Sequence, residues 1–294
     1  MDPDADVIGS TEKGPAIENT LRYVVLLGAI GVSIAACGGL LGGRIGALLG
    51  LGLAMLVAGG SWRFSDRLVI QASGARFTDA PATSAMLCEL SRWAAMRPPQ
   101  LYVTPNPQPN AFAIGRNPNN AAIVVTEGLL SLLEPTEIRA VLAHELTHIR
   151  RRDTLVTSMA GATASGVLGV AALLKRSRPA GKEGRKECSG VLVALGTRLV
   201  TRLLRFALPS DRESGADRGG SDLTGDPEAL ARALTRMERY ARVVPMEAIL
   251  AQVSAWMVNP LGGGADTAWL FSTEPPVAKR IDRLRVMPGP RVAT

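Results

Sequence analysis

The stretch His144-Glu145-Leu146-Thr147-His148 contains the only two histidines of this 294-residue chain. Residues four apart share one face of an α-helix, so both imidazoles can reach the same ion. Glu145 follows the first histidine, and on a helix it stands beside that ion, where it can act as a general base toward an attacking water. The pattern is typical of zinc hydrolases, most often peptidases.

A helix around these residues is predicted independently of the histidines. Pro135 follows Glu134 and suits the first helical position, where acidic residues also favour the helix dipole. Ile138, Val141 and Ile149 lie close to one helical stripe. The alternative is a surface helix on which the two histidines are incidental.

A catalytic zinc usually has three protein ligands and one open position. Because the chain has no third histidine, the third ligand must be a carboxylate or a thiolate. Glu213 is the best candidate, and Asp217 can orient a ligating histidine if this segment is helical. A solvated acidic face is the alternative. Cys37 lies in an apolar run, and Cys88 and Cys188 have no C-x-x-C partner, so the cysteines compete poorly.

The composition points toward a membrane surface. Hydrophobic residues make up 47% of the chain and the mean hydropathy is +0.16, which is high for a soluble enzyme. The net charge is +7, but aromatic residues are only 4% and no nucleic-acid-binding motif accompanies the charge. Attraction to the anionic headgroups of a lipid bilayer explains the basic residues better, and we expect no nucleic-acid partner. Three cysteines in unrelated settings indicate a reducing compartment.

Two uncharged runs near the N-terminus predict a helical membrane hairpin. Residues 23–43 and 45–62 are each near the length that crosses a bilayer, and only Arg44 separates them. Glycines recur every four residues through the junction, which permits close helix packing. A buried core hairpin and a lipoprotein signal ending at Cys37 are the alternatives. The acidic residues before the first run argue against a signal peptide.

A second apolar pair, residues 154–174 and 190–208, follows the helix that carries the two histidines. His148 and Glu213 must lie on the same side of a membrane to share a metal. The chain between them therefore crosses the bilayer twice, or lies on its surface with an arginine-bearing face toward the headgroups. The sequence leaves both arrangements open.

These patterns predict a mainly α fold with a small β-sheet: a membrane-anchored, zincin-like metalloprotease with helical membrane hairpins. Residues 1–62 form the N-terminal tail and membrane hairpin, and residues 63–294 form the metalloprotease domain, interrupted at about 154–208. Smaller elements are a helix at 78–96, strands at 100–104, 111–115 and 122–126, and a helix capped by Asp226. A strand near the zinc helix can pair with a substrate backbone by edge addition, or it is an ordinary edge strand.

Several motifs, taken in order, resemble the HtpX-type membrane zinc metalloproteases, relatives of the CAAX prenyl proteases. The resemblance covers nearly the whole chain and rests on these segments: Pro107-Gln108-Pro109-Asn110-Ala111-Phe112, then His144 to His148, then Arg212-Glu213 and Ala216-Asp217, and finally Phe271-Ser272-Thr273-Glu274-Pro275-Pro276 with Arg280-Ile281.

The resemblance implies one zinc ion, with Glu213 as its third ligand. It also implies that Asn110 and the strand after it, Ala111 and Phe112, contact the substrate backbone. Arg280 would hold the substrate carbonyl or the developing oxyanion. Proteins of this family cut unfolded or misfolded membrane proteins as a quality-control and stress response. They are multi-pass proteins of the bacterial inner membrane, with the active site facing the cytoplasm.

The chain departs from the family at Glu274, where a histidine is usual. An ionised glutamate cannot donate a hydrogen bond to a tetrahedral intermediate. Glu274 therefore acts in the catalytic site as a protonated carboxyl, as a partner of Arg280 or as a metal ligand. The departure also leaves an alternative function: a catalytically weak or inactive membrane adaptor that keeps the metal site.

Overall fold

The computed structural model describes residues 13–77, 80–154, 211–244, 256–257 and 275–288. The second apolar pair beyond residue 154 and Glu274 lie outside these residues. The described elements are α2 (Lys13–Ala72), β1 (Arg76–Phe77), α3 (Pro81–Trp93), β2 (Gln100–Thr104), β3 (Ala111–Asn117), β4 (Asn120–Thr126), α4 (Glu127–Leu132), α5 (Pro135–Arg150), α8 (Asp211–Thr224), α9 (Pro227–Ala241) and α11 (Val277–Arg285).

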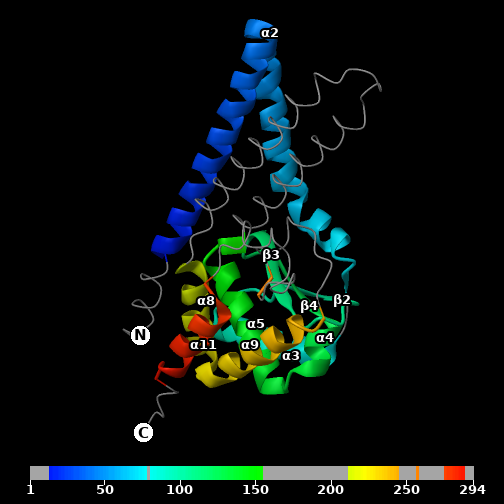
Figure 1. Ribbon diagram of the computed structural model, residues 1–294, viewed down its shortest axis with the longest axis vertical. Helices are drawn as coiled ribbons and strands as arrows, with labels where there is room; N and C mark the ends of the chain where they lie inside the picture. The colour runs from blue at the N-terminus through cyan, green and yellow to red at the C-terminus, as the bar shows by residue number, and fades with distance from the viewer. Residues whose placement is uncertain (1–12, 78–79, 155–210, 245–255, 258–274, 289–294) are drawn as a thin grey trace.

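The element α2 is a helical hairpin whose two antiparallel arms extend away from the rest of the protein (Figure 1). The arms meet at Gly42 and Gly43, and Gly43 has a φ of +61°, a conformation that glycine adopts without strain. Beyond the turn, the backbones of Gly38 and Gly46 lie so close that a Cβ on either would collide with the other. The predicted hairpin is thus present. Within the described residues, no helix combines the length and hydropathy needed to cross a bilayer.

The sheet has four strands in the order β1-β2-β4-β3. β2 and β4 are parallel, and the other two pairs are antiparallel. The strand predicted at 100–104 is confirmed with the same bounds. The predicted hairpin at 111–126 is also present, and both of its strands are two residues longer than expected because Asn117 pairs with Asn120 around a two-residue turn. β3 is an edge strand of this sheet, next to α5.

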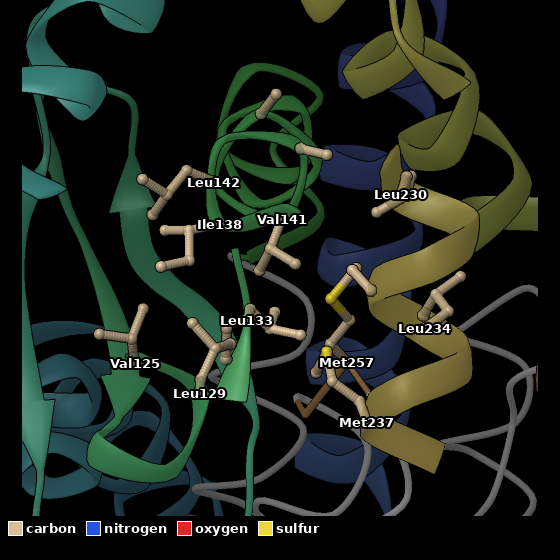
Figure 2. Close-up of a cluster of buried hydrophobic side chains, with 14 of the residues drawn as sticks. Val125, Leu129, Leu133, Ile138, Val141, Leu142, Leu230, Leu234, Met237 and Met257 are labelled. Carbon is tan, nitrogen blue, oxygen red and sulfur yellow. The ribbon is translucent and has the colours of Figure 1, made fainter. Parts of the chain in front are cut away.

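The core forms where α5 lies between the sheet and α9 (Figure 2). Ile138, Val141 and Leu142 of α5 belong to the same buried cluster as Val125 of β4 and Leu234 of α9. Every residue of α5 from Ala140 to Ile149 is buried, so this is a central helix. The alternative of a surface helix with incidental histidines is therefore wrong.

The ends of several helices follow the predicted signals. Glu134 precedes α5, and its backbone N–H donates to Glu137 at 2.9 Å. The carboxylate of Asp226 accepts from the backbone N–H of Ala229 and caps α9, as its position before Pro227 predicts. The helix predicted at 78–96 is shorter: α3 starts at Pro81 and ends at Trp93, because Ala95 takes a positive φ of 51°.

The helix α8 packs closely against α5 through glycines. A Cβ on Gly220 would lie 2.9 Å from both the Cα and the N of His144, and one on Gly219 would lie 2.6 Å from the Thr147 side chain. Only a residue without a Cβ permits this approach. Gly220 therefore sets the distance between the two helices at the level of His144.

We predict that Gly220→Ala destabilises the protein by about 1–3 kcal/mol, because the added methyl meets backbone atoms that cannot rotate away. The bound zinc per chain should fall with it, because α8 moves away from α5. Thermal unfolding and metal analysis measure both effects. Gly52→Ala is the matched control, since a Cβ there meets nothing within 4 Å. Equal stability in both variants would show that the helix spacing does not depend on Gly220.

Candidate metal centre and active site

Three side chains from two helices converge at the metal site. The Nε2 atoms of His144 and His148 are 3.1 Å apart. His144 Nε2 lies 3.5 Å from Oε2 of Glu213, and His148 Nε2 lies 3.5 Å from Oε1. Ligands at about 2.0–2.1 Å from a tetrahedral zinc lie about 3.3 Å from one another, so the spacing fits that ion. All three residues are buried. A buried pair of imidazoles with one carboxylate is a donor set that suits zinc.

The second nitrogen of each histidine faces a carboxylate. His144 Nδ1 lies 3.1 Å from Asp217 Oδ1, and His148 Nδ1 is hydrogen-bonded to Asp153 Oδ2 at 2.9 Å. Such partners fix the ring orientation and keep Nε2 free for the metal. Asp153 reaches His148 because α5 ends at Arg150 and Arg152 takes a left-handed conformation, with φ of 60°. The Glu213–Asp217 pair is 3% exposed, which excludes the solvated acidic face.

Arg280, on α11, compensates the buried negative charge. Its Nε and Nη2 atoms hold Asp217 at 2.9 and 2.7 Å, and Nη1 lies 3.2 Å from Glu213. The side chain is 1% exposed. Buried charges persist only when they are paired in this way. The structure places Arg280 beside the metal ligands, and its contact with a substrate carbonyl stays a prediction.

The charges around the ligands set their protonation. Burial alone would lower the pKa of His148, but the carboxylates of Glu213 and Asp153 outweigh burial and raise it to about 10. Burial would raise the pKa of Glu213, but the positive charges of His148 and Arg280 hold it well below its usual range. Glu213 is thus ionised and able to bind a cation, whereas His148 must give up a proton to do so.

Glu145 lies at the wall of a small cavity that His148 and Glu213 also line. It is 2% exposed, and burial raises the pKa of its carboxyl group. A carboxylate in such surroundings is a stronger base than one in water. The arrangement places a buried carboxylate beside the metal site, and hydrolysis by an activated water requires a metal site and a neighbouring base.

The predicted substrate-binding residues lie at the start of β3. Asn110 is buried, and its Oδ1 accepts a hydrogen bond from the backbone N–H of Ala111 at 3.1 Å. Phe112 points away from α5 into a separate apolar cluster with Val124 and Trp256. Whether these residues contact a substrate stays a prediction, and Glu274 lies outside the described residues.

Asp153 and Arg212 are site residues to which the sequence alone assigns no role. Arg212 is buried and donates to Glu213 Oε1 from Nε at 3.2 Å and from Nη2 at 3.1 Å. The signals in the sequence are their positions, just after α5 and just before Glu213, and for Arg212 its place in the Arg212-Glu213 motif. Neither position predicts burial, which depends on how α8 packs on α5.

Known proteins are similar to this sequence over almost its full length. The model of peptidase family M48 matches residues 81–287. The chain belongs to peptidase family M48. It is similar to a protease HtpX homolog of Methylibium petroleiphilum, with 36% identity over 93% of this chain and 99% of the relative. It is also similar to the HtpX homologs of Syntrophobacter fumaroxidans (40% identity over 90% and 98%) and Syntrophotalea carbinolica (38% over 92% and 99%).

The family and the geometry together identify the reaction class. The residues that converge on the metal site are those that the HtpX resemblance implies, and they lie within the matched segment. The chain is therefore a zinc metallopeptidase of the M48 family, and His144, His148 and Glu213 form its metal site.

We predict that zinc binding to the metal-free protein at pH 7 releases protons. A pKa of about 10 means that His148 is protonated at pH 7 without metal, whereas a ligating imidazole must be neutral. Zinc affinity should therefore rise with pH from neutral toward about 10. Calorimetric titration in buffers of different ionisation enthalpy measures the protons released. The same binding enthalpy in every buffer would contradict the prediction.

Proposed function

We propose that this chain is a membrane-attached zinc endopeptidase that cleaves unfolded or misfolded segments of membrane proteins, with Glu145 as the general base. One observation carries the proposal: Glu145 is buried beside the metal ligands, in a cavity that Ala113 of the edge strand β3 also lines. A metal site for structure alone needs neither a neighbouring base nor a strand edge.

Glu145 provides the proton transfers of the reaction. Its buried carboxylate takes a proton from the attacking water and passes a proton to the leaving amine. Zinc, when bound, supplies Lewis acidity that favours attack on the scissile carbonyl. Asp217 and Asp153 hold the two histidine rings in place during this step, and Arg280 balances the negative charge of Glu213 and Asp217.

The edge strand β3 supports an extended, unfolded substrate. An edge strand presents unpaired backbone groups that a peptide can bind by adding one more strand. Ala113 of β3 lines the same cavity as Glu145, so a peptide along this edge would bring a backbone amide close to the base. A folded protein seldom offers a free extended segment, which favours unfolded regions and internal cleavage sites.

The hairpin α2 supports attachment to the bacterial inner membrane. Large apolar side chains on both arms are strongly exposed, including Leu40 (88%), Ile45 (72%), Leu48 (70%), Leu49 (70%) and Leu56 (73%). Large apolar side chains exposed in such number are typical of a surface that contacts a membrane or another protein. The resemblance to HtpX-type proteases adds an active site that faces the cytoplasm and a role in protein quality control.

We predict that the purified full-length protein with zinc cleaves casein, and that Glu145→Gln lowers kcat by about 10²–10⁴-fold because no general base remains. The zinc content should stay at one per chain. Peptide release and metal analysis measure both quantities. Glu127→Gln is the matched control, because Glu127 is exposed at the start of α4.

The outcomes of this experiment separate the two functions. Equal activity of wild type and Glu145→Gln would point to a contaminating protease and contradict the role of Glu145. No cleavage by either protein, with one zinc bound to each, would favour the inactive adaptor.

We predict that wild-type protein stays in the membrane fraction after an alkaline carbonate wash, and that Leu48→Glu/Leu49→Glu lowers that fraction. A charge within the bilayer costs about 2.5–3.5 kcal/mol, whereas at an exposed position in water it costs little. Val243→Glu, at another exposed apolar residue, is the control. Release of the wild type by carbonate would contradict membrane insertion.

A further inference from the structure

The edge of β3 beside the metal site is covered by two residues of the chain itself. The backbone N–H of Met257 donates to the carbonyl oxygen of Ala111 at 2.9 Å. The carbonyl oxygen of Met257 accepts from Nη1 of Arg280 at 3.1 Å. A peptide that adds to an edge strand makes main-chain hydrogen bonds of the first kind. Met257 therefore makes a contact with β3 that a substrate would make.

The two side chains fill apolar sites on either side of this edge. The ring of Trp256 packs edge-on against Phe112, with centroids 4.4 Å apart. Met257 enters the core cluster that also contains Met237 of α9 (Figure 2). Both residues are at most 3% exposed. The two neighbouring side chains therefore lie in different clusters, Met257 in the one that contains α5 and Trp256 in the one that contains Phe112.

The covered edge leaves little room beside the catalytic residues. With Trp256 and Met257 in place, the cavity lined by Glu145, His148 and Glu213 has a volume of about 10 Å³. That volume holds about one water-sized molecule. A peptide needs far more space than this to reach the metal ligands.

We propose that Trp256 and Met257 occupy the place of a substrate strand on β3, and that a substrate peptide must displace them to reach the metal ligands. The inference rests on the proposed peptidase function. The substrate residues that replace them are large and apolar, because they enter sites shaped for tryptophan and methionine. The indole N–H of Trp256 is buried without an acceptor among the described residues, which is unusual for a permanent core residue.

The first test is the rate of casein cleavage by Trp256→Ala. Loss of the contact with Phe112 lowers the population of the covered state, so kcat/KM rises by about threefold to tenfold. Trp93→Ala is the matched control: Trp93 is half-exposed on α3 and packs against Arg139. Trp256→Leu keeps part of the apolar volume and serves as the milder variant if Trp256→Ala does not fold. Lower kcat/KM with unchanged zinc and unfolding temperature would overturn the proposal.

The second test measures binding without cleavage. A fluorescent peptide with the sequence of residues 254–259 is titrated into zinc-loaded Glu145→Gln and Glu145→Gln/Trp256→Ala. The peptide should bind the double variant about threefold to tenfold more tightly, because the edge is less often covered. Equal affinities would overturn the proposal. This result does not depend on hydrolysis, so it separates a failure of the inference from a failure of the peptidase function, which the comparison of Glu145→Gln with wild type decides.

Discussion

The close packing of α8 against α5 is the constraint on which the rest of the site depends. Gly220 brings the two helix backbones together at His144. Asp217 lies about one turn before Gly220 on α8, and Glu213 lies about two turns before it. Because these acids share one helical face, a single contact places both the third ligand and the partner of His144. A wider spacing between the helices would leave two histidines without a carboxylate, and such a site holds zinc less well.

That packing buries several charges, and the fold compensates them in pairs. Arg280 spans Asp217 and Glu213, while Arg212 holds the other oxygen of Glu213. Leaving a buried carboxylate without its partner is costly, so α11 is held to α8 by the same contacts that set the metal site. The charges also explain why Glu213 stays ionised although it is buried. Stability and metal binding in this region are therefore linked through the same few side chains.

The strand order places an edge strand next to the metal site. β3 ends the sheet because β4 lies between it and β2, so among the described residues one side of β3 has no strand neighbour. Exposed strand edges favour aggregation, and proteins usually protect them. Here Met257 covers the edge at Ala111, and Arg280 holds the far side of the same residue. Arg280 of α11 thus contacts both the metal ligand Glu213 and Met257, the residue that lies on the edge of β3. The arginine that compensates the buried carboxylates also helps to hold Met257 beside the site.

The sequence by itself determined the elements that local patterns encode. The spacing of His144 and His148, the caps at Glu134 and Asp226, the strand at Gln100–Thr104 and the glycine turn at Gly42 and Gly43 all depend on near neighbours in the chain. Glu213 was a candidate from spacing and resemblance, but a pair four residues apart is also typical of a solvated face. Only the tertiary structure decided that Glu213 and Asp217 are buried, that Asp153 turns back onto His148, and that Met257 lies on the edge of β3. These contacts join residues far apart in the chain or depend on a backbone conformation at one residue, and no local pattern of hydrophobicity specifies either.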